Sequence, residues 1–188
     1  MSNDQNFADI DLTNATLADL ENLDFNAILG KDISEYNLSS NLPDGTYLLH
    51  IEKLDRKDTA ADTEKEKKAR ISANLQLKVH RAIQVNDADI DLATLEGRTH
   101  FESYNVLSDF GVQGIIKLVL GVVGVSFKDK EAIKQVGSSV FALLNQLISE
   151  KVIFGAQVKT VERGGYENCN IVLKEKSFIA MDAAAELL

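Results

Sequence analysis

Basic and aromatic side chains recur along the alternating segments of this sequence, on the sides that alternation predicts to face solvent. Cations in such positions can contact phosphates, and exposed rings can stack on nucleotide bases, at about 1–3 kcal/mol per stacked base. Any one of these residues alone is more often a solvated charge or a tyrosine at the rim of the core. Their coincidence on outer faces and at strand ends predicts a nucleic-acid contact surface. The candidate DNA-binding residues are Arg70, Lys78, Arg98, His100, Tyr104, Lys159, Arg163, Tyr166 and Lys174.

The sequence holds no recognisable catalytic or metal-binding motif. His50, His80, His100 and Cys169 are its only imidazole and thiol groups, and no pair has the close spacing of a structural zinc site. It also lacks a phosphate loop, a nucleophile elbow and an HExxH helix. We therefore expect no enzyme activity, no bound metal and no cofactor.

The acidic charge of the chain is concentrated at its N-terminus. Residues 1–45 carry nine acidic residues and one basic residue, which gives a net charge of −8 out of the total of −9. Residues 46–180 carry nineteen basic and eighteen acidic residues, a net charge of +1. The body of the chain is therefore nearly neutral and can hold a local basic face toward a polyanion.

Length and composition predict one soluble, intracellular domain. The 188 residues, 45% of them hydrophobic, are enough for a single buried core. No run of about 18 apolar residues occurs, and the N-terminus is acidic where a signal peptide would be basic and then apolar. The single cysteine, Cys169, cannot form an internal disulfide, which fits a reducing compartment. We expect a cytoplasmic protein without a membrane-spanning segment.

Local patterns divide the chain into three parts. Residues 1–45 form an acidic arm that we expect to be partly helical or disordered, because its leucines stand at loose helical spacing among acids. The only proline lies in Leu42-Pro43-Asp44-Gly45, a string that predicts a turn just before the domain. The domain covers residues 46–180, and residues 181–188 form a short tail.

The first half of the domain predicts three strands, at residues 46–56, 69–82 and 98–106. The second is the clearest, because its apolar and polar residues alternate strictly over eleven positions. Its apolar face carries Ile71, Ala73, Leu75, Leu77 and Val79. The charged stretch 57–68 between the first two strands predicts a solvated hairpin loop.

Two helices and two further strands follow. Helical periodicity begins after the N-cap Ser108 and ends at Gly124, and a second helix is predicted at about 129–149 with an apolar face that includes Phe141. Alternation at 151–162 and 166–178, across Arg163-Gly164-Gly165, then predicts a hairpin. This order fits a five-stranded OB-type barrel with a two-helix insertion, at about 108–150, between strands 3 and 4. An open α+β sheet would fit the same order.

Three short motifs together resemble a known family. They are Leu42-Pro43-Asp44-Gly45-Thr46-Tyr47, the strand from Gly97 to Asn105, and Gly164-Gly165-Tyr166. The chain resembles small phage-encoded single-stranded DNA-binding proteins with an OB fold, found among replication and recombination genes and often uncharacterised. The resemblance covers roughly Leu42 to Phe178, and the C-terminus lacks the dense acidic tail common in such proteins.

The resemblance implies a protein that binds single-stranded DNA without sequence preference during phage DNA replication or recombination, in the cytoplasm of the host cell. Phage replication or recombination proteins would then be partners of the acidic arm. Two other functions fit the composition. A virion or scaffold-type protein–protein interaction module would use the arm and the apolar helices for assembly, and an acidic DNA mimic or inhibitor would use the net charge of −9.

Overall fold

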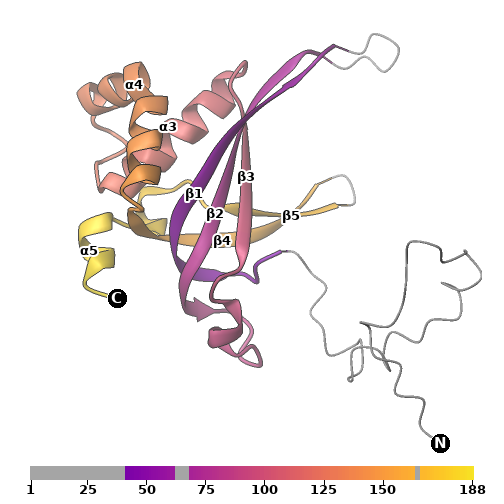
Figure 1. The fold of residues 1–188 in the computed structure, drawn as a ribbon, viewed down its shortest axis with the longest axis vertical. Coiled ribbons are helices and arrows are strands. Elements are labelled where there is room, and N and C mark those ends of the chain that lie inside the picture. The colour runs from indigo at the N-terminus through magenta and orange to yellow at the C-terminus, as the bar shows by residue number, and fades with distance from the viewer. Residues whose placement is uncertain (1–40, 62–67, 164–165) are drawn as a thin grey trace, which may run out of the picture. The chain divides into compact units, whose positions relative to one another are not determined.

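The structure is a computed structural model that describes residues 41–61, 68–163 and 166–188 (Figure 1). The predicted acidic arm lies outside these residues, apart from its last five positions, and so does the middle of the charged loop. Residues 41–188 belong to one unit of the chain, built on an antiparallel sheet.

Six strands form this sheet within the described residues. The order across the sheet is β3-β2-β1-β4-β5, and the short strand β6 pairs with β4. All pairings among the described strands are antiparallel, and no backbone ladder between described residues joins β3 to β5 to close a barrel. The strands are β1 (Gly45–Thr59), β2 (Arg70–Val85), β3 (Thr99–Asn105), β4 (Ile153–Arg163), β5 (Tyr166–Ile171) and β6 (Phe178–Ile179).

Alternating burial along β2 confirms the clearest of the sequence predictions. Ala73, Leu75, Leu77 and Val79 are buried, while Asn74, Gln76 and Lys78 between them are partly exposed. The alternation begins one residue late, because Ser72 is buried and Ile71 is only partly buried. The buried face packs against the buried side chains of β1 and the helices, because period-two alternation sends every second residue into the core.

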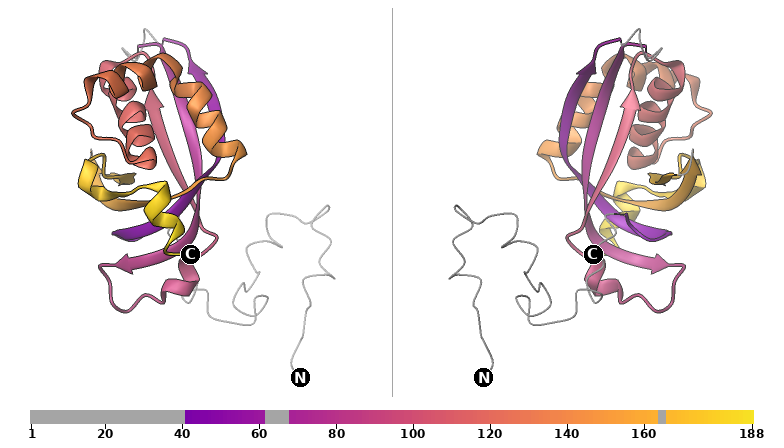
Figure 2. Two further views of the ribbon diagram at one scale, coloured as in Figure 1. Left: turned by 90° about the vertical axis from the view of Figure 1, so that its left-hand side faces the viewer. Right: turned by 90° about the vertical axis from the view of Figure 1, so that its right-hand side faces the viewer.

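Two helices between β3 and β4 cover one face of the sheet. Helix α3 (Asp109–Val123) begins after Ser108, whose Oγ accepts a hydrogen bond from Gly111 N at 3.1 Å, and ends at Gly124, where φ is 74°. Helix α4 (Lys130–Ser149) packs on α3 and on β1. The two views of Figure 2 show these helices on one side of β1, β2 and β3, with no described helix covering the opposite side. That uncovered side is called the outer face below.

Two short 3-10 helices and a C-terminal helix complete the described chain. The 3-10 helix η3 (Leu92–Leu95) leads into β3, and η4 (Glu175–Ser177) leads into β6. Helix α5 (Met181–Ala185) packs on β4.

Three predictions about elements are wrong in detail. The expected loop at 57–68 is shorter, because β1 continues to Thr59. The expected last strand at 166–178 ends at Ile171, and the chain then turns through η4 into β6. Phe141 is 45% exposed, since the buried stripe of α4 runs through Val136, Val140 and Leu144 and Phe141 lies about 100° around the helix from it.

Candidate nucleic-acid interface

A groove of about 920 Å³ lies where the two ends of the strand order, β3 and β5, approach each other beside the start of α3. One wall comes from β3 and the first turn of α3, and the other comes from β5 and the adjoining part of β4. Its polar lining is rich in amide and hydroxyl side chains, which belong to Asn41, Ser103, Asn105, Ser108, Asn168 and Asn170.

Two phenylalanine rings line this groove and are open to solvent. Phe101 on β3 is 66% exposed, and Phe110 in the first turn of α3 is 78% exposed. Large exposed rings of this kind bury no core surface, so they are available to stack on a planar ligand.

The position of Phe110 depends on a close approach between α3 and β3. Gly111 lies against the end of β3, and a Cβ at this position would overlap the backbone carbonyl of Asn105. Gly114, one turn later, lies under the ring of Tyr104, where a Cβ would come within 2.9 Å of ring carbons. Small residues at both positions therefore hold the start of α3, and with it Phe110, at the wall of the groove.

Basic side chains reach the groove from both sides. Arg70, the first residue of β2, donates a hydrogen bond from its guanidinium to Ser103 Oγ at 3.2 Å, which holds it across β3. Lys159 is exposed on β4, next to the partly exposed Val161. The carboxylates of Glu167 and Glu102 also line the groove, so its charge is mixed.

Glu102 joins the two walls of the groove at its floor. Its Oε1 accepts a hydrogen bond from Ile171 N of β5 at 2.5 Å and lies 2.9 Å from Nε2 of His100 on its own strand. The side chains of Glu102 and His100 are 6% and 4% exposed, and buried groups of this kind need such partners. A side chain therefore ties β3 to β5 where no backbone ladder does.

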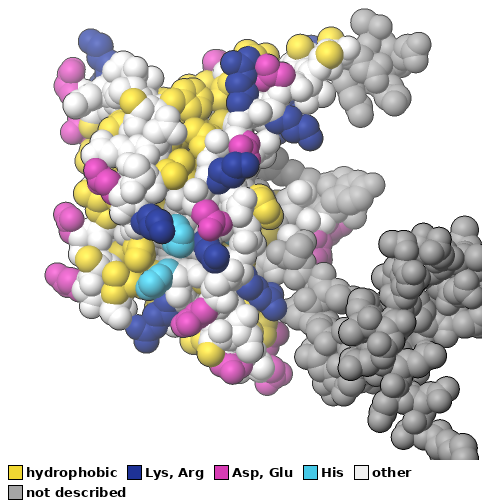
Figure 3. Space-filling model, in the orientation of Figure 1, with side chains coloured by type: hydrophobic (Ala, Val, Ile, Leu, Met, Phe, Trp, Pro, Cys, Tyr) yellow, Lys and Arg dark blue, Asp and Glu magenta, His cyan; other side chains and the backbone are white. Residues whose placement is uncertain are grey.

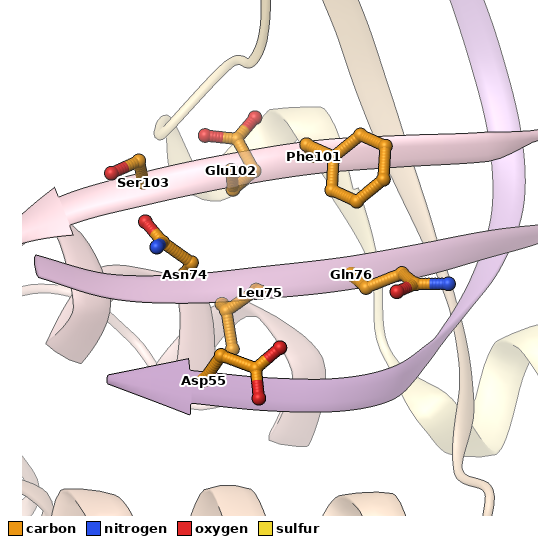
Figure 4. A pocket seen from close by; sticks show the side chains of 7 residues that line it. All are labelled: Asp55, Asn74, Leu75, Gln76, Phe101, Glu102 and Ser103. Atoms are coloured by element: carbon orange, nitrogen blue, oxygen red, sulfur yellow. The ribbon is translucent and has the colours of Figure 1, made fainter. Parts of the chain in front are cut away.

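A smaller hollow of about 280 Å³ lies on the other side of Phe101, over the outer face of β1, β2 and β3. Figure 4 shows Asn74 and Gln76 on β2 between Asp55 of β1 and the Phe101–Ser103 segment of β3. Phe101, Glu102 and Ser103 line both this hollow and the groove. The Phe101 ring therefore stands at the border between the groove and the polar outer face.

Of the predicted contact residues, Arg70 and Lys159 lie in the groove as basic, exposed groups. Lys78 lies on the outer face, as predicted, with its Nζ 3.8 Å from Glu52 Oε1, and it does not line the groove. Arg98 is half-buried just before β3, where its carbonyl accepts a hydrogen bond from Val79 N. Lys174 is exposed but belongs to the turn before η4, not to a strand shared with Tyr166.

The predicted exposure of His100 and Tyr104 is wrong. The two residues do share one side of β3, but it is the inner side, and Tyr104 is 7% exposed. Burial, followed by the neighbouring Glu102 carboxylate, raises the pKa of the Tyr104 phenol well above its usual value. The His100–Glu102 pair makes this inner side polar, which is why polarity alone indicated the wrong side.

Arg163 and Tyr166 are register partners at the end of the β4–β5 hairpin. Their side chains lie outside the described residues, so their predicted contacts stay predictions.

Sequence reasoning missed the two exposed rings. Phe101 is flanked by His100 and Glu102, so an apolar residue pointing outward between two buried polar ones reverses the usual pattern. Phe110 directly follows Ser108 and Asp109 at the start of α3. A large apolar ring in the first turn of a helix is the sequence signal that could have indicated an exposed contact residue there.

Comparison with known proteins identifies no family for this chain. No family model matches it, and no curated protein matches its sequence. Across residues 41–61, 68–163 and 166–188, no three His, Cys, Asp or Glu side chains are grouped so as to hold a metal ion. In the same part of the chain, the helices are too short or too polar to cross a membrane.

Proposed function

We propose that this protein binds single-stranded DNA without sequence preference, in the groove between β3 and β5. The observation that carries this proposal is that one groove combines two exposed rings, Phe101 and Phe110, with two basic side chains, Arg70 and Lys159. Single-strand binding needs this combination, because the rings stack on unpaired bases while the cations contact the phosphates.

The strand order supports an OB-type barrel as the scaffold of this proposal. Such barrels have five strands in a Greek-key arrangement and are partly open. The order β3-β2-β1-β4-β5, with the helices inserted between β3 and β4, is the order expected for a barrel opened at the seam between β3 and β5. The Glu102 bridge across this seam and the likeness of the sequence motifs to phage single-stranded DNA-binding proteins support the same interpretation. A role in phage DNA replication or recombination is part of this proposal.

Binding should prefer single strands and weaken steeply with salt. In a duplex the base faces are already stacked, so Phe101 and Phe110 have nothing to contact. Phosphate contacts release counterions, so affinity falls as salt rises. Titration of fluorescently labelled oligo-dT and of a matched duplex, followed by anisotropy at low and moderate salt, measures both properties.

Four variants test the groove itself. Phe101→Ala and Phe110→Ala should each lower the affinity for oligo-dT by roughly 5- to 150-fold, the equivalent of about 1–3 kcal/mol for one stacked base. Phe101→Tyr should retain most of the affinity, because the ring remains. The double variant Arg70→Glu with Lys159→Glu should reduce both the affinity and its dependence on salt.

Matched controls lie on α4. Phe141→Ala removes an exposed ring, and Lys134→Glu reverses an exposed charge, at positions that do not line the groove. Both should bind oligo-dT like the wild type. Groove variants that bind as well as these controls, or a wild-type protein with no affinity for oligo-dT at low salt, would overturn the proposal.

A protein–protein interaction module is the second candidate function. Val112 and Phe141 are exposed and line a cleft of about 480 Å³ between α3 and α4. Leu107 and Phe110, which precede Val112 in the chain, are exposed as well. Exposed apolar patches of this kind often mark protein interaction sites. If this candidate is right, Phe141→Ala should impair assembly with a partner protein and oligo-dT binding should be absent.

A further inference from the structure

Basic side chains from three elements meet on the outer face, outside the groove. His50 of β1 is the register partner of Lys78 on β2 and of Ile153 on β4. His80 follows Lys78 by two residues, so it shares the same face of β2. Lys151 joins them from the turn between α4 and β4, and it contributes to the electrostatic field at His50. The histidine patch consists of His50, Lys78, His80 and Lys151.

In the view of Figure 3, exposed histidine side chains have Lys or Arg side chains beside them, with Asp or Glu side chains close by. None of the four residues of the histidine patch lines the groove or the hollow beside Phe101. The patch is therefore a separate cluster of positive groups, which the proposed groove does not use.

The backbone of Lys151 gives a second sign that its side chain matters. Its φ is 48°, and it is the only residue other than glycine in the described chain with a positive φ. A helix that ends in this left-handed conformation usually has glycine or asparagine there, because a Cβ adds strain. A lysine at this point tolerates that strain, and its charge acts on His50 of β1. It also follows the C-terminal end of α4, where positive charge is favourable.

Of the charged or titratable side chains that act on His50, three are basic (His80, Lys151 and Lys78) and one is acidic (Glu52). Burial is the main cause of a lowered pKa at His50, and the nearby His80, Lys151 and Lys78 lower it further. Glu52 of β1 opposes this shift, but it is shared, because it also pairs with Lys78 and accepts a hydrogen bond from Gln76 Nε2 at 2.9 Å. Glu150, the residue before Lys151, is also shared, because its carboxylate accepts a hydrogen bond from Gln146 Nε2.

We propose that the histidine patch is a second phosphate-binding site, which takes up protons when a polyanion binds. That the polyanion is the same DNA strand rests on the proposed function. A bound phosphate supplies the negative charge that the patch lacks, and it favours the charged form of both imidazoles.

One strand can reach both sites only if it is long enough. Arg70 at the groove and Lys78 in the patch lie eight residues apart on β2, or roughly 26 Å at 3.3 Å per residue. At the rise of a B-form strand, about 3.4 Å per nucleotide, that distance corresponds to roughly eight nucleotides, and a more extended single strand covers it with fewer. Oligo-dT of 20 nucleotides should therefore engage the groove and the patch together, whereas oligo-dT of four nucleotides should not.

The sign of the pH effect follows from linkage. Because phosphate stabilises the protonated imidazoles, their pKa should be higher in the complex than in the free protein. The additional affinity is complete below the free-state pKa and disappears as the pH rises through the bound-state pKa. Each histidine whose pKa rises by about one unit makes binding about tenfold tighter at the low end of this window than at the high end.

The test has two arms. In the first, NMR titration of the full chain follows the imidazole resonances from pH 5 to 8, with and without inorganic tripolyphosphate. The pKa of His50 should rise on addition, and the His80 resonance should shift with the tripolyphosphate concentration. The resonance of the buried His100 should not change with tripolyphosphate, which makes it an internal control.

In the second arm, oligo-dT of 20 nucleotides is titrated at pH 6 and pH 8. The wild type should bind more tightly at pH 6, the double variant His50→Gln with His80→Gln should lose this difference, and Lys151→Gln should weaken binding at both pH values. Lys134→Gln, an exposed lysine on α4, is the matched control.

The two proposals fail separately. Histidine resonances that ignore both tripolyphosphate and oligo-dT, with oligo-dT binding unaffected by the double histidine variant, would overturn the patch and leave the groove intact. If oligo-dT does not bind but tripolyphosphate shifts the resonances of both histidines in the patch, the proposed function fails and the phosphate site stands.

Discussion

The carboxylate of Glu102 should be the most sensitive single group in the seam between β3 and β5. Glu102→Ala would remove the acceptor for Ile171 N and the partner of His100 Nε2, and both groups would stay buried. Loss of one partner of a buried ionic or hydrogen-bonded pair costs about 3–5 kcal/mol. Glu102→Gln keeps an acceptor of similar shape, so it should cost only about 1–1.5 kcal/mol, the difference between a charge-assisted and a neutral hydrogen bond.

Urea unfolding followed by circular dichroism measures these free energies. For a domain of this size, 1 kcal/mol corresponds to about 2–4 °C in Tm, so Glu102→Ala should lower Tm by roughly 6–20 °C. Ser103→Ala is a suitable comparison. Ser103 follows Glu102 on β3 and its side chain is exposed, so this substitution should change stability little. A Glu102→Ala protein as stable as the wild type would refute the idea that this side chain joins β3 to β5.

Three further predictions concern other parts of the chain. Gly111→Ala should destabilise the fold by about 1–3 kcal/mol in urea unfolding and weaken oligo-dT binding, because the new Cβ overlaps the Asn105 carbonyl and displaces Phe110. A Gly111→Ala protein as stable as the wild type would contradict the close approach of α3 to β3. Burial raises the pKa of the Cys169 thiol to about 11, so a thiol reagent at pH 8 should label Cys169 only after unfolding, and rapid labelling of the native protein would count against burial. The free energy of unfolding should fall as the pH rises from about 9 toward 11, because the thiol of the unfolded chain ionises first. Deleting residues 1–40, which carry a net charge of −7, should tighten oligo-dT binding most at low salt, where repulsion is least screened, and an unchanged affinity would show that this charge has no influence.

Local sequence patterns predicted most of the elements in the described chain. Strict alternation located β2 and its buried face, and the caps at Ser108 and Gly124 located both ends of α3. These features depend on residues that are close together in sequence, so the physical causes of alternation and capping can be read directly from the chain.

The side of β3 that faces the core could not be predicted in the same way. Both sides of this strand are partly polar, and the buried side carries the His100–Glu102 pair while the exposed side carries Phe101. Which side is buried depends on whether a distant backbone group, Ile171 N, is available to satisfy the Glu102 carboxylate. On β3, a hydrogen bond to a distant strand therefore allows two polar side chains to be buried while an apolar ring stays exposed, the reverse of the usual hydrophobic pattern.

The sequence by itself determined the first four strands, the two long helices and the concentration of acidic charge before the domain, because these follow from local periodicity and composition. The candidate residues Arg70 and Lys159 were also found from sequence. Only the tertiary structure decided that they share a groove with Phe101 and Phe110, and that the histidine patch lies elsewhere on the same sheet. Residues this far apart in sequence come together only through strand pairing and helix packing, and these depend on long-range contacts that no local pattern contains.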